Sequence, residues 1–165
     1  MMRDPKMNTC KGHIAIALAF AACILLAGTA RAQETERPAR MKDLPQAVQT
    51  TVREQSRGAA VRGLSIETEN GQTFYEASLK VNGRVRDVLI DADGNVVEIE
   101  EQVTLASLPP AARAEIMKQA GKGRILTVES ITKNNAIVAY EAHVKTAGKN
   151  SEIKVDPDGK PLPPK

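Results

Sequence analysis

Apolar and polar residues alternate along this chain in two different rhythms. Leu44, Val48 and Val52 lie four residues apart, which places them on one face of an expected helix. After this segment the period falls to two, most regularly from Tyr75 to Val81, where every second residue is apolar. Such alternation is typical of strands that bury one sheet face and leave the other in water. The pattern predicts a helix followed by strands.

Short turn signals separate these strands. Asn70-Gly71 and Asn82-Gly83 are favoured in tight hairpins because both residue types tolerate a positive φ. Asp93-Gly94 provides a third turn. Because the connections are so short, the strands are expected to run antiparallel as a meander. At the helix ends, Asp43 is expected to act as a cap, and glycines at 58 and 121 are expected to stop the two helices.

The same order of residues occurs twice. The helix positions Leu44, Val48 and Val52 recur as Leu108, Ala112 and Ile116; Tyr75-Glu76-Ala77 recurs as Tyr140-Glu141-Ala142; and Asp91-x-Asp93-Gly94 recurs as Asp156-x-Asp158-Gly159. We therefore predict an α+β fold of two tandem repeats, residues 43–103 and 104–160. Each would be one helix packed on an antiparallel meander sheet of three or four strands. The fourth strand of the second repeat should be missing or vestigial, because only the Pro-rich tail, residues 161–165, follows it.

Two further expectations concern the core. Tyr75 and Tyr140 should be core anchors, because both lie at inward positions of the alternation. The two repeats should pack together as one cooperative unit, since about 60 residues bury only a marginal core alone.

The N-terminal residues predict export. Arg3, Lys6 and Lys11 precede an uncharged apolar run, and Ala30-Arg31-Ala32 is a typical cleavage signal. We interpret residues 1–32 as a signal peptide and residues 33–42 as a flexible lead, so the exported form would begin at Gln33 and be periplasmic or secreted. An uncleaved membrane anchor is the weaker interpretation, because a span needs about 20 apolar residues.

Removal of this segment changes the composition. It holds four basic residues and one acidic residue, so the remainder of a chain with 23 basic and 20 acidic residues has no net charge. A neutral chain with few aromatic residues lacks the features of a nucleic-acid binder. Both cysteines also leave, and His143 becomes the only histidine. No catalytic triad, phosphate loop or zinc spacing is present. We expect no enzyme activity, no cofactor and no membrane association after cleavage.

Two polar groups are candidate sites. Asp91 and Asp93 suggest a calcium loop, but Val96 stands where such a loop requires glycine and Gln102 where it requires glutamate. They are better explained as turn residues, and the Asp156 segment is interpreted in the same way. His143 is expected to be a solvated residue on the outward sheet face, so no metal site is predicted.

The sequence resembles the PepSY-like family of exported bacterial proteins. The resemblance rests on Leu44-Pro45, Tyr75-Glu76-Ala77, Asn82-Gly83 and Asp91-x-Asp93-Gly94, and on their second occurrence from Leu108-Pro109 onward. In tandem form this layout is similar to that of the β-lactamase inhibitor protein. The resemblance implies a non-catalytic binding or inhibitory module that presents a sheet face to another protein.

Four apolar residues fall at positions of the first repeat that should be exposed to solvent: Phe74, Val85, Leu89 and Val96. Scattered apolar surface residues are ordinary, whereas a contiguous patch would mark a partner surface. We predict that these residues form that surface and that the protein binds or inhibits an envelope protein, such as a protease. The alternative is a sensor or binding protein for a small ligand or metal ion in the cell envelope. The partner's identity and the oligomeric state are left open.

Overall fold

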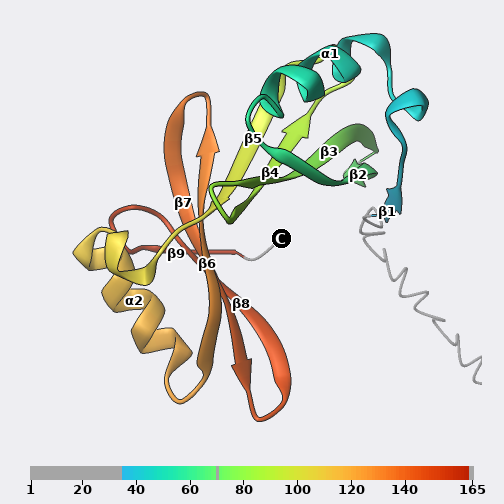
Figure 1. The fold of residues 1–165 in the computed structure, drawn as a ribbon. Coiled ribbons are helices and arrows are strands. Elements are labelled where there is room, and N and C mark those ends of the chain that lie inside the picture. The colour runs from blue at the N-terminus through green and yellow to red at the C-terminus, as the bar shows by residue number, and fades with distance from the viewer. Residues whose placement is uncertain (1–34, 70, 164–165) are drawn as a thin grey trace, which may run out of the picture. The chain divides into compact units, whose positions relative to one another are not determined.

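The computed structural model describes residues 35–69 and 71–163. The expected signal peptide, residues 1–32, lies outside the described residues, as do the last two residues of the chain. The described part contains nine strands, two α-helices and two short 3-10 helices (Figure 1). In chain order the elements are β1 (Thr35–Pro38), η1 (Met41–Asp43), α1 (Gln46–Gln55), β2 (Ala60–Glu69), β3 (Gln72–Val81), β4 (Arg84–Ile90), β5 (Val96–Gln102), η2 (Leu105–Ser107), α2 (Pro110–Ala120), β6 (Arg124–Lys133), β7 (Ala136–Thr146), β8 (Lys149–Val155) and β9 (Pro161–Leu162).

The strands form one continuous sheet rather than two. Their order runs from β1 to β9 without a crossover, and every neighbouring pair is antiparallel. The predicted fold class, two tandem repeats with a separate sheet each, is therefore wrong. The error lies at β5, which pairs with β6 from Ile99↔Thr132 to Gln102↔Glu129. An open strand edge leaves N–H and C=O groups without partners, and pairing with the next strand satisfies them.

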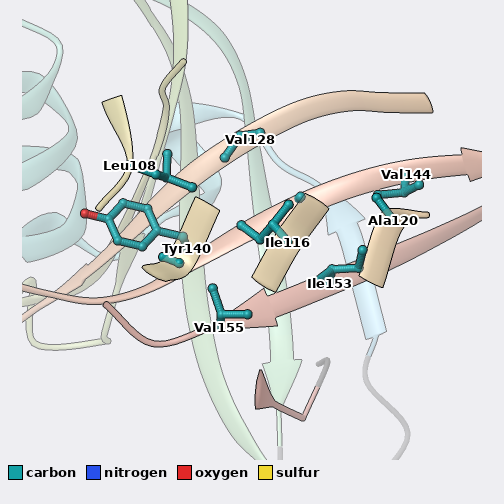
Figure 2. Close-up of a cluster of buried hydrophobic side chains, with 10 residues drawn as sticks. Leu108, Ile116, Ala120, Val128, Tyr140, Val144, Ile153 and Val155 are labelled. Carbon is teal, nitrogen blue, oxygen red and sulfur yellow. The ribbon is translucent and has the colours of Figure 1, made fainter. Parts of the chain in front are cut away.

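Helix α1 contacts β4, and α2 contacts β7 and β8. Val48 and Val52, four residues apart on α1, are both buried, as the period of four predicts. They join one core cluster with Leu79, Val88 and Ile90 and others. A second cluster lies under α2, where Ile116 is fully buried and Leu108, Tyr140 and Val155 surround it (Figure 2). The expected burial of Tyr140 is confirmed, whereas Tyr75 is half-buried beside the first cluster.

Two turns pack directly against the helix starts. Gly94 has a φ of +87°, and a Cβ atom added to it would lie 3.0 Å from the backbone of Ala47 in α1. Gly159 has a φ of +83°, and its Cβ would lie 2.7 Å from the Ala111 carbonyl oxygen in α2. Both positions therefore require glycine for two independent reasons, the backbone conformation and the close approach of a helix.

The same turns explain why aspartate occurs at positions 91 and 156. The Asp91 carboxylate accepts hydrogen bonds from the backbone N–H groups of Asp93 and Asn95, at 3.0 and 2.8 Å. The Asn95 side chain donates another, and this bond lowers the pKa of Asp91 from its ordinary value. Asp156 accepts the equivalent pair of backbone hydrogen bonds in the last turn. The aspartates thus hold the turns, as expected from their residue type.

Several local expectations differ from the structure. Residues 33–42, expected as a flexible lead, include the edge strand β1, which pairs with β2. Asp43 does not cap α1, because its carboxylate accepts from the backbone and side chain of Arg40 at the start of η1. Helix α1 ends at Gln55, before the expected stop at Gly58, whereas α2 ends at Ala120 with Gly121 as its C-cap, as predicted. The last strand, β9, has only two residues, in keeping with the expected vestigial strand.

Candidate functional site

The sheet face opposite the helices, hereafter the outer face, carries most of the unusual chemistry. In β3 and β4 the inward positions Ala77, Leu79 and Val88 are fully buried, so the residues between them project to the other side. Across the outer face, Leu89 of β4 pairs with Glu76 of β3 and Glu98 of β5. Leucine is therefore flanked by a carboxyl group on each side.

Carboxyl groups crowd a shallow depression on this face. Its lining consists of one apolar residue and five acidic ones: Leu89, Glu67, Glu76, Asp87, Glu98 and Glu100. Burial raises the pKa of Glu76 to about 8, and a hydrogen bond with Glu67 together with the negative charges of Glu67, Asp87 and Glu36 adds to the effect. A carboxyl group in such surroundings keeps its proton at neutral pH unless a cation approaches.

A larger pocket, hereafter the outer pocket, opens next to this depression. Its volume is about 400 Å³, and it combines apolar and charged side chains: Phe74, Leu89, Val97, Glu69, Gln72, Asp91, Glu98 and Lys133. Glu98 is only 3% exposed and forms an ion pair with Lys133 at 2.7 Å. Such a pocket offers apolar contact for an aliphatic stem and carboxylates for a positive charge at its end.

The structure brings together two of the four residues predicted to form the partner surface. Phe74 and Leu89 both line the outer pocket. Val85 is half-buried and pairs with Lys80 on the outer face, but it does not line this pocket. Val96 lies on the opposite face, because it pairs with Ile90 and packs against the first core cluster.

A bulge in β5 explains the misplacement of Val96. The register shifts so that Leu89 pairs with Glu98 while Ile90 pairs with Val96. One extra residue, Val97, is inserted, and this valine lines the outer pocket. Because Val96 was predicted to face outward, strict alternation placed its neighbour Val97 inward, and no residue in the segment marks the bulge.

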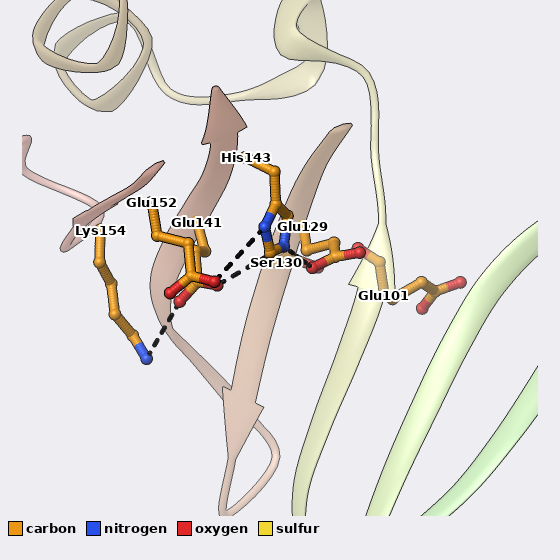
Figure 3. A network of polar contacts seen from close by, with 7 residues as sticks. All are labelled: Glu101, Glu129, Ser130, Glu141, His143, Glu152 and Lys154. Carbon is orange, nitrogen blue, oxygen red and sulfur yellow. Dashed lines mark hydrogen bonds and ion pairs between the residues drawn. The ribbon is translucent and has the colours of Figure 1, made fainter. Parts of the chain in front are cut away.

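A second polar group lies on the outer face of β6, β7 and β8. The His143 Nε2 atom is 3.3 Å from a carboxylate oxygen of Glu129 and 3.7 Å from one of Glu141 (Figure 3). The His143 Nδ1 atom is 3.6 Å from Glu152. Lys154 lies on the other side of Glu141, 3.5 Å from its Oε2 atom. The histidine is on the predicted face, but it contacts three carboxylates instead of water alone, and its side chain is only 37% exposed.

Sequence reasoning missed the burial of these acids. Glu98 and Glu141 occupy outward positions and are nevertheless 3% and 6% exposed. The available signal was the recurrence of glutamate at outward positions of neighbouring strands. Without the register, that recurrence did not show which of these residues face one another.

Comparison with solved structures finds proteins of the same fold. A protein of Bacteroides eggerthii described as a candidate periplasmic protein superposes with a TM-score of 0.60 at 19% identity, over 73% of this chain and 86% of its own. A BLIP-like protein of Bacteroides fragilis superposes with a TM-score of 0.52 at 22% identity, over 72% and 83%. A DUF2874 family protein of Bacteroides uniformis gives a TM-score of 0.56 at 18% identity, over 72% and 86%. The fold is thus shared with BLIP-like and DUF2874 proteins.

No family model matches the sequence, and the search of curated proteins finds no match. The description of the first structural neighbour agrees with the expected periplasmic or secreted localisation. Among the described residues, no helix has the length and apolar character needed to cross a bilayer.

Proposed function

We propose that this chain is an exported, non-enzymatic module that binds another protein of the cell envelope, such as a protease, through the outer pocket. The bound element would be a basic side chain, arginine or lysine, that projects from the partner. The observation that carries this proposal is the composition of the pocket. Phe74, Leu89 and Val97 stand beside three carboxyl groups, those of Glu69, Asp91 and Glu98, and beside one amine, that of Lys133, which pairs with Glu98.

The chemistry of the pocket fits such a side chain closely. Long basic side chains have an apolar stem and a charged head, and they bury the stem when the head finds a negative partner. Glu76, in the neighbouring depression, has a pKa of about 8 because it is buried among other carboxyl groups. A cation placed near this group would lower its pKa, release its proton and gain a charge-assisted contact.

Two further observations support a binding role. A BLIP-like protein shares the fold, and the tandem layout of the sequence is similar to that of the β-lactamase inhibitor protein. The order of motifs in the sequence resembles the PepSY-like family, and we include this relationship, together with export by residues 1–32 as a signal peptide, in the proposal. Binding or inhibition of an envelope protein is consistent with these likenesses.

The test is a capture experiment with Leu89→Lys. Leu89 lies between Glu76 and Glu98, so a lysine at this position finds two carboxyl groups and should cost little stability. Its ammonium group would occupy the place of the partner's cation. Immobilised wild-type protein should retain an envelope protein from an extract, and Leu89→Lys should retain it at least about 10-fold less strongly. Retention should also weaken as the salt concentration rises.

The matched control is Ile137→Lys, because Ile137 is an apolar residue of β7 that is 47% exposed and does not line the outer pocket. This variant should retain the same protein as wild type. The proposal fails if Leu89→Lys retains every partner, or if the two lysine variants lose retention equally.

A further inference from the structure

The second polar group of the outer face has the arrangement of a metal site. Glu129 of β6 pairs with Glu141 of β7, and His143 of β7 pairs with Glu152 of β8. One oxygen of Glu129, one oxygen of Glu141 and one ring nitrogen of His143 all lie within 4.8 Å of one another. The three side chains therefore converge on one point from two adjacent strands (Figure 3).

The spacing of these atoms suits a tetrahedral ion. With metal–ligand bonds of about 2.0–2.2 Å, two ligand atoms of a tetrahedral zinc ion lie about 3.4 Å apart. The His143 Nε2 atom is 3.3 Å from Glu129 and 3.7 Å from Glu141. An ion could thus be held with only small movements of the side chains.

The burial of Glu141 is a further indication. Its side chain is 8% exposed, so it is more than nine-tenths buried. Its Oε1 atom faces the proposed site and lies 3.7 Å from His143 Nε2, and its Oε2 atom faces Lys154 Nζ at 3.5 Å without a hydrogen bond from the described residues. A buried carboxylate costs free energy unless it is paired closely or coordinates a metal. Contacts of this length compensate that cost only in part.

The other ring nitrogen of His143 also faces a carboxylate. Its Nδ1 atom faces Glu152 at 3.6 Å. Histidines that bind metals usually donate their second N–H to a carboxylate, which fixes the tautomer and the ring orientation. Glu152 is in the position for this role.

The surroundings of His143 favour a cation. Three carboxyl groups, those of Glu129, Glu141 and Glu152, lie within 3.7 Å of its ring nitrogens, and Lys154 pairs with Glu141. A metal ion placed among these groups would offset the cost of holding several carboxylates together in a partly buried site.

We propose that Glu129, Glu141 and His143 form a binding site for one divalent transition-metal ion of the zinc type, with Glu152 as the residue that positions the imidazole. An imidazole with two carboxylates suits zinc, whereas calcium takes six to eight oxygen ligands. The site lies on β6–β8, and none of its three ligands lines the outer pocket. It is independent of the proposed protein-binding function.

Calorimetric titration with Zn²⁺ after treatment with a chelator tests this proposal. The full chain is used, with Cys10→Ser, Cys23→Ser and His13→Ala, so that the N-terminal residues contribute no zinc ligand. We expect one ion per chain. His143→Ala should abolish stoichiometric binding, and its melting temperature without zinc, compared with that of the parent, reports whether it is folded.

Two further variants distinguish a specific zinc site from nonspecific attraction of zinc ions to carboxylates. Glu152→Gln should weaken zinc binding by about 10–100-fold, because it loses only the group that orients the imidazole. Glu36→Gln, in the other carboxylate cluster of the outer face, should leave binding unchanged. The proposal is overturned if the parent binds no zinc, or if a folded His143→Ala protein binds zinc as tightly as the parent.

Discussion

Replacement of Glu76 by glutamine should make the protein more stable at pH 8 and leave its stability unchanged near pH 4.5. Glu76 lies on the outer face between Ser65 of β2 and Leu89 of β4. Burial and the neighbouring Glu67 raise its pKa to about 8 in the folded protein. Glutamine has nearly the same shape, is always neutral, and can still donate a hydrogen bond to Glu67.

The sign and size of the effect follow from proton linkage. In the unfolded chain Glu76 loses its proton near pH 4.5, but the folded protein keeps it up to about pH 8. Between these values the folded state binds the extra proton, so the free energy of unfolding falls as pH rises. The loss is at most about 1.4 kcal/mol per pH unit, or about 5 kcal/mol over an interval of about 3.5 pH units. Glu76 is partly exposed, and solvent screening reduces this to about 1–2 kcal/mol.

Urea unfolding followed by circular dichroism at pH 4.5, 6 and 8 measures the effect. The difference between Glu76→Gln and wild type should be near zero at pH 4.5 and grow to about 1–2 kcal/mol in favour of the variant at pH 8. Because the other acids titrate in both proteins, the difference isolates this position. Glu54→Gln, at an exposed position of α1, should show no such trend. A difference that does not change with pH would refute the reasoning.

Two other changes test the packing. Leu108→Ala should reduce the free energy of unfolding by about 2–5 kcal/mol, because Leu108 is 4% exposed in the core under α2. Since the sheet is continuous, its denaturation should remain a single transition, and two separate transitions in calorimetry would contradict this. Met117→Ala, at 55% exposure, should stay within about 0.5 kcal/mol. Gly159→Ala should reduce the free energy of unfolding, measured by chemical denaturation, clearly more than Gly71→Ala does. Both glycines have a positive φ, but of the two only Gly159 lies against a helix backbone. Equal losses of stability would exclude a role for that contact.

Much of the local structure could be read from the sequence. Val48 and Val52 are buried, as the period of four residues in the helix predicted. Ala77 and Leu79 are buried, as the period of two residues in the strand predicted. The turn at Gly94 also formed where expected. These features depend on residues that are close in the chain, through backbone preference and the side of the helix or strand on which each residue lies.

The candidate sites were predictable only in part. Phe74 and Leu89 were identified from broken alternation, and both line the outer pocket. Val96 was misplaced, because the bulge that turns it inward has no marker in the sequence. The partners of His143 were not foreseen, because Glu129 and Glu152 lie on other strands and reach it only in one register.

The sequence by itself determined the order of the two helices and of most strands, the buried side of most of these elements and the turns between them. The tertiary structure decided that β5 pairs with β6 to form one sheet, and that the glutamates of neighbouring strands share one face. The reason is physical. Local preferences involve a few neighbouring residues. Strand pairing and the burial of a charge depend instead on groups that are far apart in the chain. These groups come into contact only when the order and the register of all the strands in the sheet are fixed.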